Sequence, residues 1–131
     1  MAPETLRGGL VAWLPPIGWA ALIFALSAQP DLRFLPDDGL DFVLRKVGHM
    51  GVFGILALLL WRALTATTAT PRPWAWAVSL TVAYAITDEL HQSGVVGRNA
   101  SAGDIVVDAV GALIAVAAVG LVRARWTLRR T

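Results

Sequence analysis

Apolar residues fall into four long runs along the chain, separated by short polar segments. The runs cover about residues 10–28, 47–64, 74–92 and 104–122. Each run approaches the roughly 20 mostly apolar residues that a helix needs to cross the hydrocarbon core of a bilayer. The pattern therefore predicts an all-α integral membrane protein. We expect a four-helix transmembrane bundle that forms a single domain over residues 1–131.

Composition agrees with a lipid environment. Of the 131 residues, 56% are hydrophobic, which is more than a typical soluble domain contains. The formal net charge is +2, but the basic residues are scattered or lie at the ends of runs, so a nucleic-acid surface is not expected. The chain has no cysteine, which excludes disulfides and thiolate-bound metal.

Two features of the first run bear on its shape and on whether it is cleaved as a signal peptide. Pro15 and Pro16 lie within it and predict a kink, because proline cannot donate the backbone hydrogen bond of a helix. Arg7 before the run and the small residues at its end also resemble a signal peptide. The length of the run and its two prolines favour a retained span.

Lysine and arginine indicate the orientation of the spans. Seven of these residues lie at the termini or between the second and third runs, and four lie on the opposite side. The positive-inside rule therefore predicts a multi-pass protein of the plasma (inner) membrane with both termini in the cytoplasm. The seven are Arg7, Arg62, Arg72, Arg123, Arg125, Arg129 and Arg130, and the four are Arg33, Arg45, Lys46 and Arg98.

Ionisable and amide side chains gather where three runs begin or end. A charged group costs about 2.5–3.5 kcal/mol at the centre of a bilayer, so each one needs an explanation. Successive spans run in opposite directions, which brings the start of the second, the end of the third and the start of the fourth to one side. We expect one polar patch at the outer face, where His49, Asp88, Glu89, His91, Gln92, Asp104 and Asp108 gather, and an outward-facing pocket within it.

Helical periodicity assigns faces to the fourth run. At 100° per residue, Asp104, Asp108, Gly111 and Ala115 share one stripe. Small residues let helices approach closely, so this stripe should face protein. Ser101 and Asp104 also have the spacing of a capping box, so capping of the helix start is an alternative role for both.

The same geometry separates two faces of the third run. Glu89 and Gln92 share one side, whereas Asp88 and His91 lie on another and are expected to be interfacial and solvated. The polar segment from residue 29 to 41 is expected to be a solvated loop. Arg98, in the loop of residues 93–103, is interpreted as a phosphate contact, a salt-bridge partner or a headgroup anchor.

The order and spacing of several motifs resemble the VanZ-like family of membrane proteins. The resemblance covers nearly the whole chain from Phe24 to the end of the fourth run, and two positions depart from the family pattern, Arg45 in place of an acidic residue and Asp108 in place of asparagine. The motifs are Phe24-Ala25-Leu26-Ser27-Ala28-Gln29-Pro30, Lys46-x-x-His49-x-x-x-Phe53, Glu89-x-x-Gln92, Arg98-x-x-Ser101-x-x-Asp104 and Gly111.

The resemblance implies a set of site residues and a link to teicoplanin, a lipoglycopeptide antibiotic. His49, Glu89 and Asp104 are the catalytic candidates. The ligand-binding candidates are Lys46, Gln92, Arg98, Ser101 and Asp108. No spacing such as HExxH indicates a metal site, and the sequence names no cofactor.

Three functions remain open at this stage. The favoured hypothesis is a polar pocket that binds a membrane lipid or lipid-linked cell-wall precursor, with Lys46 and Arg98 holding an anionic headgroup. The second is a membrane hydrolase or transferase that uses the histidine and carboxylates as general acid and base. The third is a non-catalytic packing or assembly protein whose polar groups satisfy one another.

Overall fold

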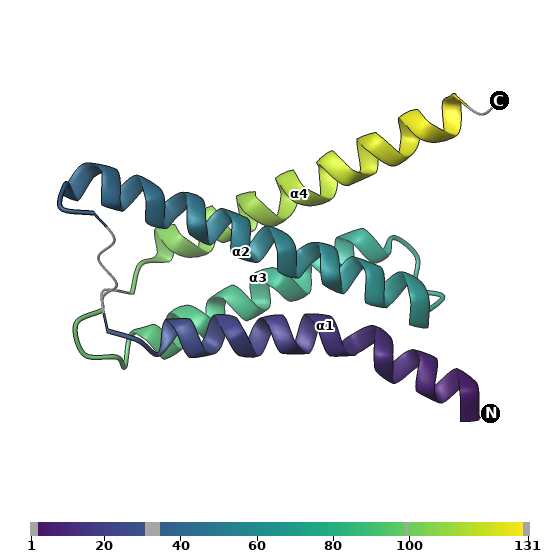
Figure 1. Cartoon of the computed structure of the whole chain (residues 1–131), viewed down its shortest axis with the longest axis horizontal. Coiled ribbons are helices and arrows are strands. Elements are labelled where there is room, and N and C mark those ends of the chain that lie inside the picture. Colours follow the sequence, from purple (N-terminus) through teal and green to yellow (C-terminus); the bar gives the residue numbers. More distant parts are fainter. Residues whose placement is uncertain (1–2, 31–34, 99, 130–131) are drawn as a thin grey trace.

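The computed structural model describes residues 3–30, 35–98 and 100–129, and these residues form an all-α bundle (Figure 1). The predicted fold class is confirmed. Arg33 and Arg130, and the side chain of Arg7, all used to predict orientation, lie outside the described part. The helices are α1 (Pro3–Ser27), α2 (Asp38–Thr67), α3 (Pro73–Gln92) and α4 (Ala102–Leu128).

Three of these helices are long and apolar enough to cross a membrane. Within the described residues they are Gly8–Ser27, Asp38–Thr67 and Ala102–Leu128, and the protein is a multi-pass membrane protein. α3 is not among them, since ionisable and amide side chains occupy its last turns. Its 20 residues correspond to roughly 30 Å, which matches the apolar thickness of a bilayer. That α3 also crosses the membrane stays a prediction.

α1 continues through the two prolines and bends near its N-terminal end (Figure 1). Two aromatic side chains then fix its distance from its neighbours. Trp19 donates from Nε1 to the carbonyl oxygen of Val52 on α2 at 2.9 Å. Tyr84 of α3 donates to the carbonyl oxygen of Ala20 at 2.6 Å. These hydrogen bonds keep the last turns of α1 against α2 and α3.

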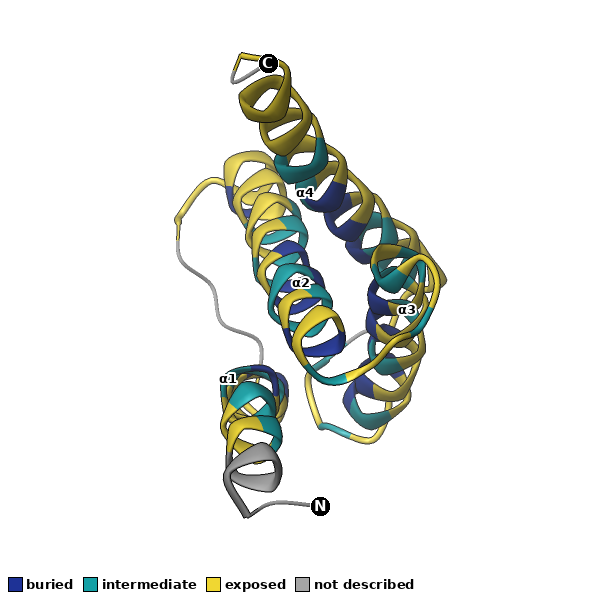
Figure 2. Ribbon diagram, turned by 90° about the vertical axis from the view of Figure 1, so that its right-hand side faces the viewer, coloured by how far each residue is buried: buried dark blue, intermediate teal, exposed yellow. Residues whose placement is uncertain are grey.

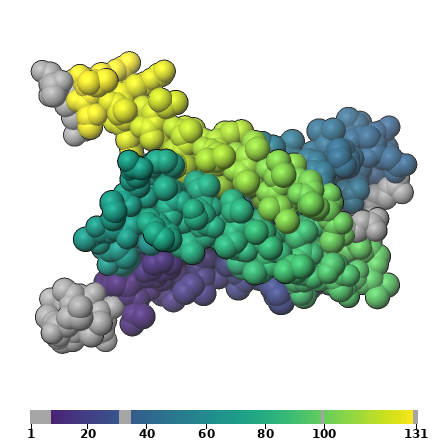
Figure 3. All heavy atoms as spheres, turned by 180° about the vertical axis from the view of Figure 1, so that it is seen from behind, coloured from purple at the N-terminus to yellow at the C-terminus, as the bar shows by residue number. Residues whose placement is uncertain are grey.

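α2 is the central helix, because its contacts with the other three helices are the most extensive in the bundle. Buried residues lie on the facing sides of α2, α3 and α4, and apolar residues are exposed around the outside (Figure 2). From the opposite side, α3 lies between α1 and α4, and the last turns of α4 stand clear of the bundle (Figure 3). An apolar exterior around a partly polar interior suits a lipid solvent.

The closest approach in the bundle is the crossing of α2 and α4. A Cβ atom added at Gly111 would overlap the backbone of Met50, and one at Gly54 would lie 3.2 Å from Ala115 Cβ. The stripe of small residues therefore faces protein, as expected. Gly48 and Gly51, which share a side of α2 with Gly54, have no such neighbours.

α2 begins earlier than the apolar run. The sequence predicts a solvated loop up to residue 41, but the helix starts at Asp38, and Asp37 caps it by accepting from Leu40 N–H at 2.8 Å. Asp41 is buried, and accepts from Leu35 N–H at 3.0 Å. The prediction was wrong because the capping and pairing of these aspartates, which stabilise a helix start, outweigh their preference for loops.

Two connections meet at one end of the bundle. The α1–α2 and α3–α4 connections lie together there, while both termini and the α2–α3 connection lie at the other end (Figure 1). The polar ends of α2, α3 and α4 are therefore neighbours, and the end of α1 joins them. We call this end of the molecule the polar end.

Candidate functional site

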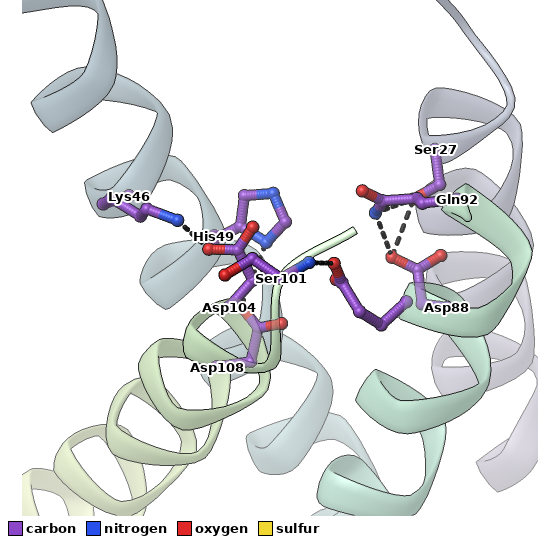
Figure 4. A network of polar contacts seen from close by, with 9 residues as sticks. Ser27, Lys46, His49, Asp88, Gln92, Ser101, Asp104 and Asp108 are labelled. Carbon is purple, nitrogen blue, oxygen red and sulfur yellow. Dashed lines mark hydrogen bonds and ion pairs between the residues drawn. The ribbon is translucent and has the colours of Figure 1, made fainter. Parts of the chain in front are cut away.

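Two basic side chains of α2 pair with two carboxylates of α4 (Figure 4). Lys46 forms an ion pair with Asp104, and His49 Nδ1 lies 3.1 Å from Asp108 Oδ1. Asp108 is only 1% exposed. We call these four residues the α2–α4 cluster. The close crossing at Gly111 lies next to it on α4, so the same approach that packs the helices also brings the paired groups together.

Ser101 caps α4, whereas Asp104 has another role. Ser101 Oγ accepts from the N–H of Gly103 at 3.2 Å, and Ser101 has the extended backbone of an N-cap residue. The carboxylate of Asp104 turns instead to Lys46. The side chain of Asp104 therefore contacts another helix and does not cap α4.

Glu89 holds the loop between α3 and α4. Its Oε1 accepts the backbone N–H of Ser101, and the side chain is buried. This bond ties the start of α4 to the last turn of α3. Glu89 is thereby engaged with backbone and has no ion-pair partner among the described residues.

Three neutral or acidic side chains join α1 to α3. Ser27 Oγ and Gln92 Nε2 each donate to Asp88 Oδ2 at 2.8 Å, and Gln92 also donates to Ser27 Oγ at 3.2 Å (Figure 4). All three side chains are buried. We call them the α1–α3 cluster. The other carboxyl oxygen, Asp88 Oδ1, is buried and has no hydrogen-bond partner in the described part of the chain.

The expected solvent exposure of Asp88 was wrong, and His91 is only partly exposed. Asp88 is 3% exposed, and the ring of His91 stacks on Phe24 with centroids 4.2 Å apart. Helical periodicity predicts one inward face for α3, but α1 packs on a second side of it. A helix with neighbours on two sides buries polar groups that one-face periodicity assigns to solvent.

Arg98 binds the end of α1. Its Nε donates to the carbonyl oxygen of Gln29 at 3.1 Å, and its Nη2 donates to that of Leu26 at 3.4 Å. Carbonyls at a helix C-terminus lack intrahelical donors, so a guanidinium satisfies them well. No ion pair joins Arg98 to a described carboxylate, so the salt-bridge interpretation is wrong within the described residues.

A cavity of about 710 Å³ lies between these clusters. We call it the polar cavity. Its volume falls within the roughly 300–1,000 Å³ typical of sites for small ligands. The charged and polar lining residues are Ser27, Arg45, Lys46, His49, Asp88, Gln92, Arg98, Ser101 and Asp104. Its apolar lining includes Ile23, Leu26, Phe42, Leu44, Val52 and Phe53.

Most of the candidate residues from the sequence line this cavity, but two do not. Glu89 and Asp108 are buried behind it, where they contact Ser101 and His49. They can position the residues that face the cavity. Among the described residues, no three His, Asp or Glu side chains are arranged to hold a metal ion.

Sequence reasoning missed Ser27 and Asp41 as members of the polar end, and it placed Asp88 there but on a solvated face. Ser27 lies inside the first motif of the family resemblance, but its role needs α1 to end beside α3. Asp88 lies one turn before Gln92, a spacing that allows the hydrogen bond between them. Asp41 pairs with Arg45, whose Nε lies 3.1 Å from Asp41 Oδ2.

The two departures from the family pattern are both accommodated. Arg45 has its partner one turn earlier on the same helix, at Asp41. Asp108 has its partner on α2, at His49. Each substituted residue carries a charge, and each contacts a group of complementary chemistry.

Comparison with known proteins assigns the family. The family model described as VanZ/LLP1 matches residues 10–123, a range that holds every lining residue of the polar cavity. No curated protein and no solved structure matches the chain. Because the family model covers most of the chain, this protein belongs to the VanZ/LLP1 family.

Proposed function

We propose that the polar cavity binds the phosphate-bearing headgroup of an envelope lipid or of a lipid-linked cell-wall precursor. The observation that carries the proposal is the lining itself. Three cationic side chains, Arg45, Lys46 and Arg98, share one cavity with an apolar wall. A ligand that matches both surfaces has an anionic group joined to a hydrocarbon chain, which describes a membrane lipid.

Arg98 and Lys46 are the residues suited to the phosphate. Arg98 uses Nε and Nη2 on backbone carbonyls, and its Nη1 forms no hydrogen bond to the described residues. A guanidinium held in this way offers three further N–H donors in a fixed plane, two of them on Nη1. Lys46 has three donors, so it can contact a phosphate while it remains near Asp104.

The apolar lining accounts for the lipid chain. Leu26, Phe42 and Leu44 line the cavity and are also exposed on the outside of the bundle. A headgroup inside the cavity therefore has a continuous apolar path for its hydrocarbon chain. The chain stays in an apolar environment along this path, so its placement costs little, while the phosphate contacts give the specificity.

The binding test compares lipid retention by purified variants. Arg98→Gln and Lys46→Gln should each retain about tenfold less phospholipid than the unmodified chain in native mass spectrometry, because each removes one charged hydrogen bond. Arg125→Gln is the matched control, since Arg125 is exposed on the last turns of α4, away from the cavity. Equal retention by all three variants would exclude the polar cavity as the binding site.

The proposal extends to glycopeptide susceptibility. A protein that binds lipid-linked cell-wall precursor changes what is available at the membrane surface to a lipoglycopeptide such as teicoplanin. We expect expression of the chain to raise the inhibitory concentration of teicoplanin, and Arg98→Gln to abolish the change at equal membrane abundance. An unchanged inhibitory concentration with the unmodified chain would reject this extension and leave lipid binding to be judged separately.

An enzymatic role has one observation in its favour. His49 and Asp104 line the cavity, so of the three catalytic candidates they are the two that can contact a bound substrate. Glu89 lies behind the cavity and would position Ser101. A hydrolase or transferase predicts a new product when lipid-linked substrate is incubated with the protein, and its loss in His49→Gln. Binding without turnover gives no product.

The amount of folded protein distinguishes the packing hypothesis from the binding and enzymatic hypotheses. If the polar groups serve only to hold the helices together, every variant that lowers lipid retention also lowers the amount of folded protein. Arg98→Gln distinguishes the cases most clearly, because Arg98 lies in the loop between α3 and α4 and its contacts with the end of α1 are two exposed hydrogen bonds to backbone carbonyls. A functional site predicts normal abundance with reduced lipid binding for this variant.

A further inference from the structure

Most charges at the polar end are paired, and the exceptions lie near one another. Asp41 pairs with Arg45, Asp104 with Lys46 and Asp108 with His49. Arg98, Asp88 and Glu89 have no partner of opposite charge among the described residues. Glu89 lies behind the cavity, whereas Arg98 and Asp88 line it.

Arg98 and Asp88 are both attached to the last turn of α1. Arg98 donates to the carbonyl oxygens of Leu26 and Gln29. Asp88 accepts from Ser27, which lies between them in the sequence. The guanidinium and the carboxyl group are thus held around one helical turn without forming an ion pair with each other. The space beside them is part of the polar cavity.

The carboxyl group of Asp88 is incompletely satisfied. Its two donors, Ser27 and Gln92, are neutral and both contact Oδ2, and Oδ1 has no donor within the described residues (Figure 4). A buried carboxyl group is destabilising unless charge or hydrogen bonds compensate it. Asp88 lines the polar cavity, so a ligand there with a cationic N–H donor supplies the positive charge that its two neutral partners lack.

We propose that Ser27, Asp88 and Gln92 form a subsite for a primary ammonium group, so that the preferred ligand carries an amine a short distance from its phosphate. The inference rests on the proposed lipid binding and specifies its ligand. The phosphate contacts Arg98, and the ammonium group contacts Asp88. Two sources have this chemistry: phosphatidylethanolamine, and a polyprenyl phosphate that bears an amino sugar.

The opposite charges explain why a zwitterion fits better than a simple anion. An anionic lipid without an amine, such as phosphatidylglycerol, gains the contact with Arg98 but places its hydroxyl groups beside Asp88. Phosphatidylcholine carries the positive charge but has no N–H donor. Only a primary amine provides both the charge and the hydrogen bond. Comparison of phosphatidylethanolamine, phosphatidylglycerol and phosphatidylcholine therefore distinguishes the contribution of the positive charge from that of the hydrogen bond at the subsite.

The experiment is competitive lipid binding by the full-length purified protein, followed by native mass spectrometry. The unmodified chain should retain phosphatidylethanolamine about tenfold over phosphatidylcholine, which corresponds to one charge-assisted hydrogen bond. Asp88→Asn should reduce this ratio to near one, while phosphatidylglycerol still binds. Asp38→Asn, at an exposed aspartate outside the cavity lining, is the matched control and should keep the preference.

Each outcome bears on the proposal. A chain that binds all three lipids equally, or an Asp88→Asn variant that keeps the full preference, overturns the ammonium subsite. If Arg98→Gln still lowers total phospholipid retention in that case, the proposed function survives and only the subsite fails. The comparison in the unmodified chain needs no variant, so a folding defect in Asp88→Asn cannot hide a negative result.

A second arm distinguishes the two sources of the amine. Phosphatidylethanolamine competes with a polyprenyl phosphate that bears a glucosamine unit, and with the same polyprenyl phosphate bearing N-acetylglucosamine. Stronger binding of the glucosamine lipid than of phosphatidylethanolamine identifies the lipid-linked sugar as the source, and the reverse identifies the phospholipid. In either case the N-acetyl form, which lacks the cation, should bind about tenfold more weakly than the free amine.

Discussion

The α2–α4 and α1–α3 contacts both bury aspartates at the polar end, but they treat the charge differently. Asp108 on α4 is 1% exposed and contacts the imidazole of His49. Asp88 on α3 is 3% exposed and has only the neutral partners Ser27 and Gln92. The two aspartates are therefore almost equally buried, but only Asp108 has a basic partner that compensates its charge.

The difference separates a structural role from a binding role. A buried carboxyl group paired with a base has its charge compensated inside the fold, and it also fixes the position of the helix that carries it. A carboxyl group without a base leaves part of its interaction energy available to a ligand. On this proposal Asp108 holds the wall of the cavity in position, and Asp88 contacts the bound ligand.

The largest expected effect is a loss of stability at the α2–α4 crossing, caused by substitution of Gly111. Gly111→Ala places a Cβ atom against the backbone of Met50 and forces the two helices apart. We expect a loss of about 3 kcal/mol in unfolding free energy, at the upper end for overpacking, measured by denaturant titration in detergent micelles. Gly51→Ala is the control, because the space around Gly51 is open. Similar stability for both variants would mean that the close crossing is not required.

The second prediction applies one substitution to both aspartates. Asp108→Asn should lower the unfolding free energy by about 2 kcal/mol, since it removes a charge-assisted hydrogen bond to His49. Asp88→Asn should leave stability unchanged or raise it, since the carboxyl group there has no basic partner within the described residues. The same denaturant titration measures both. Equal losses at the two sites would erase the distinction between the clusters.

The third prediction concerns the loop that joins the two sides. Glu89→Ala removes the acceptor of the Ser101 N–H and should increase amide hydrogen exchange over residues 95–103 about tenfold, equivalent to one lost hydrogen bond. Glu89→Gln keeps an acceptor oxygen and should show a smaller increase. An exchange rate that is the same in all three proteins contradicts a positioning role for Glu89.

The smallest expected effect is at the N-cap of α4. Ser101→Ala removes the acceptor for Gly103 N–H and should cost about 1 kcal/mol of unfolding free energy. Ser101→Asp, which restores a capping oxygen, should recover most of the loss. Recovery is the informative result, because a side chain that contacted only ligand would leave stability unaffected in both variants.

Much of the fold follows from the sequence because lipid simplifies the problem. Four apolar runs predict four helices, and the alternation of directions brings three polar ends together. The stripe of Asp104, Asp108 and Gly111 correctly indicated the face of α4 that meets protein. The boundaries were less accurate at α2, where aspartates that favour loops are used as a cap and as an ion-pair partner.

Helical periodicity did not predict the α1–α3 cluster. Periodicity divides a helix into an inward and an outward face, but it does not say how many neighbours the helix has. Asp88 and His91 were assigned to solvent, yet α1 covers them. The role of Arg98 was equally inaccessible, because its partners are backbone carbonyls of a helix about 70 residues earlier, which side-chain chemistry alone does not reveal.

Photo-crosslinking from the wall of the polar cavity tests the central claim most directly. Phe42 lines the cavity and is exposed, so a photoreactive phenylalanine analogue fits at this position; the same analogue at Trp76, an exposed residue outside the lining, is the control. The account predicts that the analogue at Phe42 forms a crosslink to phospholipid that includes the headgroup, and that this headgroup adduct disappears in Arg98→Gln. The crosslink at Trp76 should be the same with and without Arg98→Gln. A Phe42 crosslink to acyl chains alone, unaffected by Arg98→Gln, would contradict it.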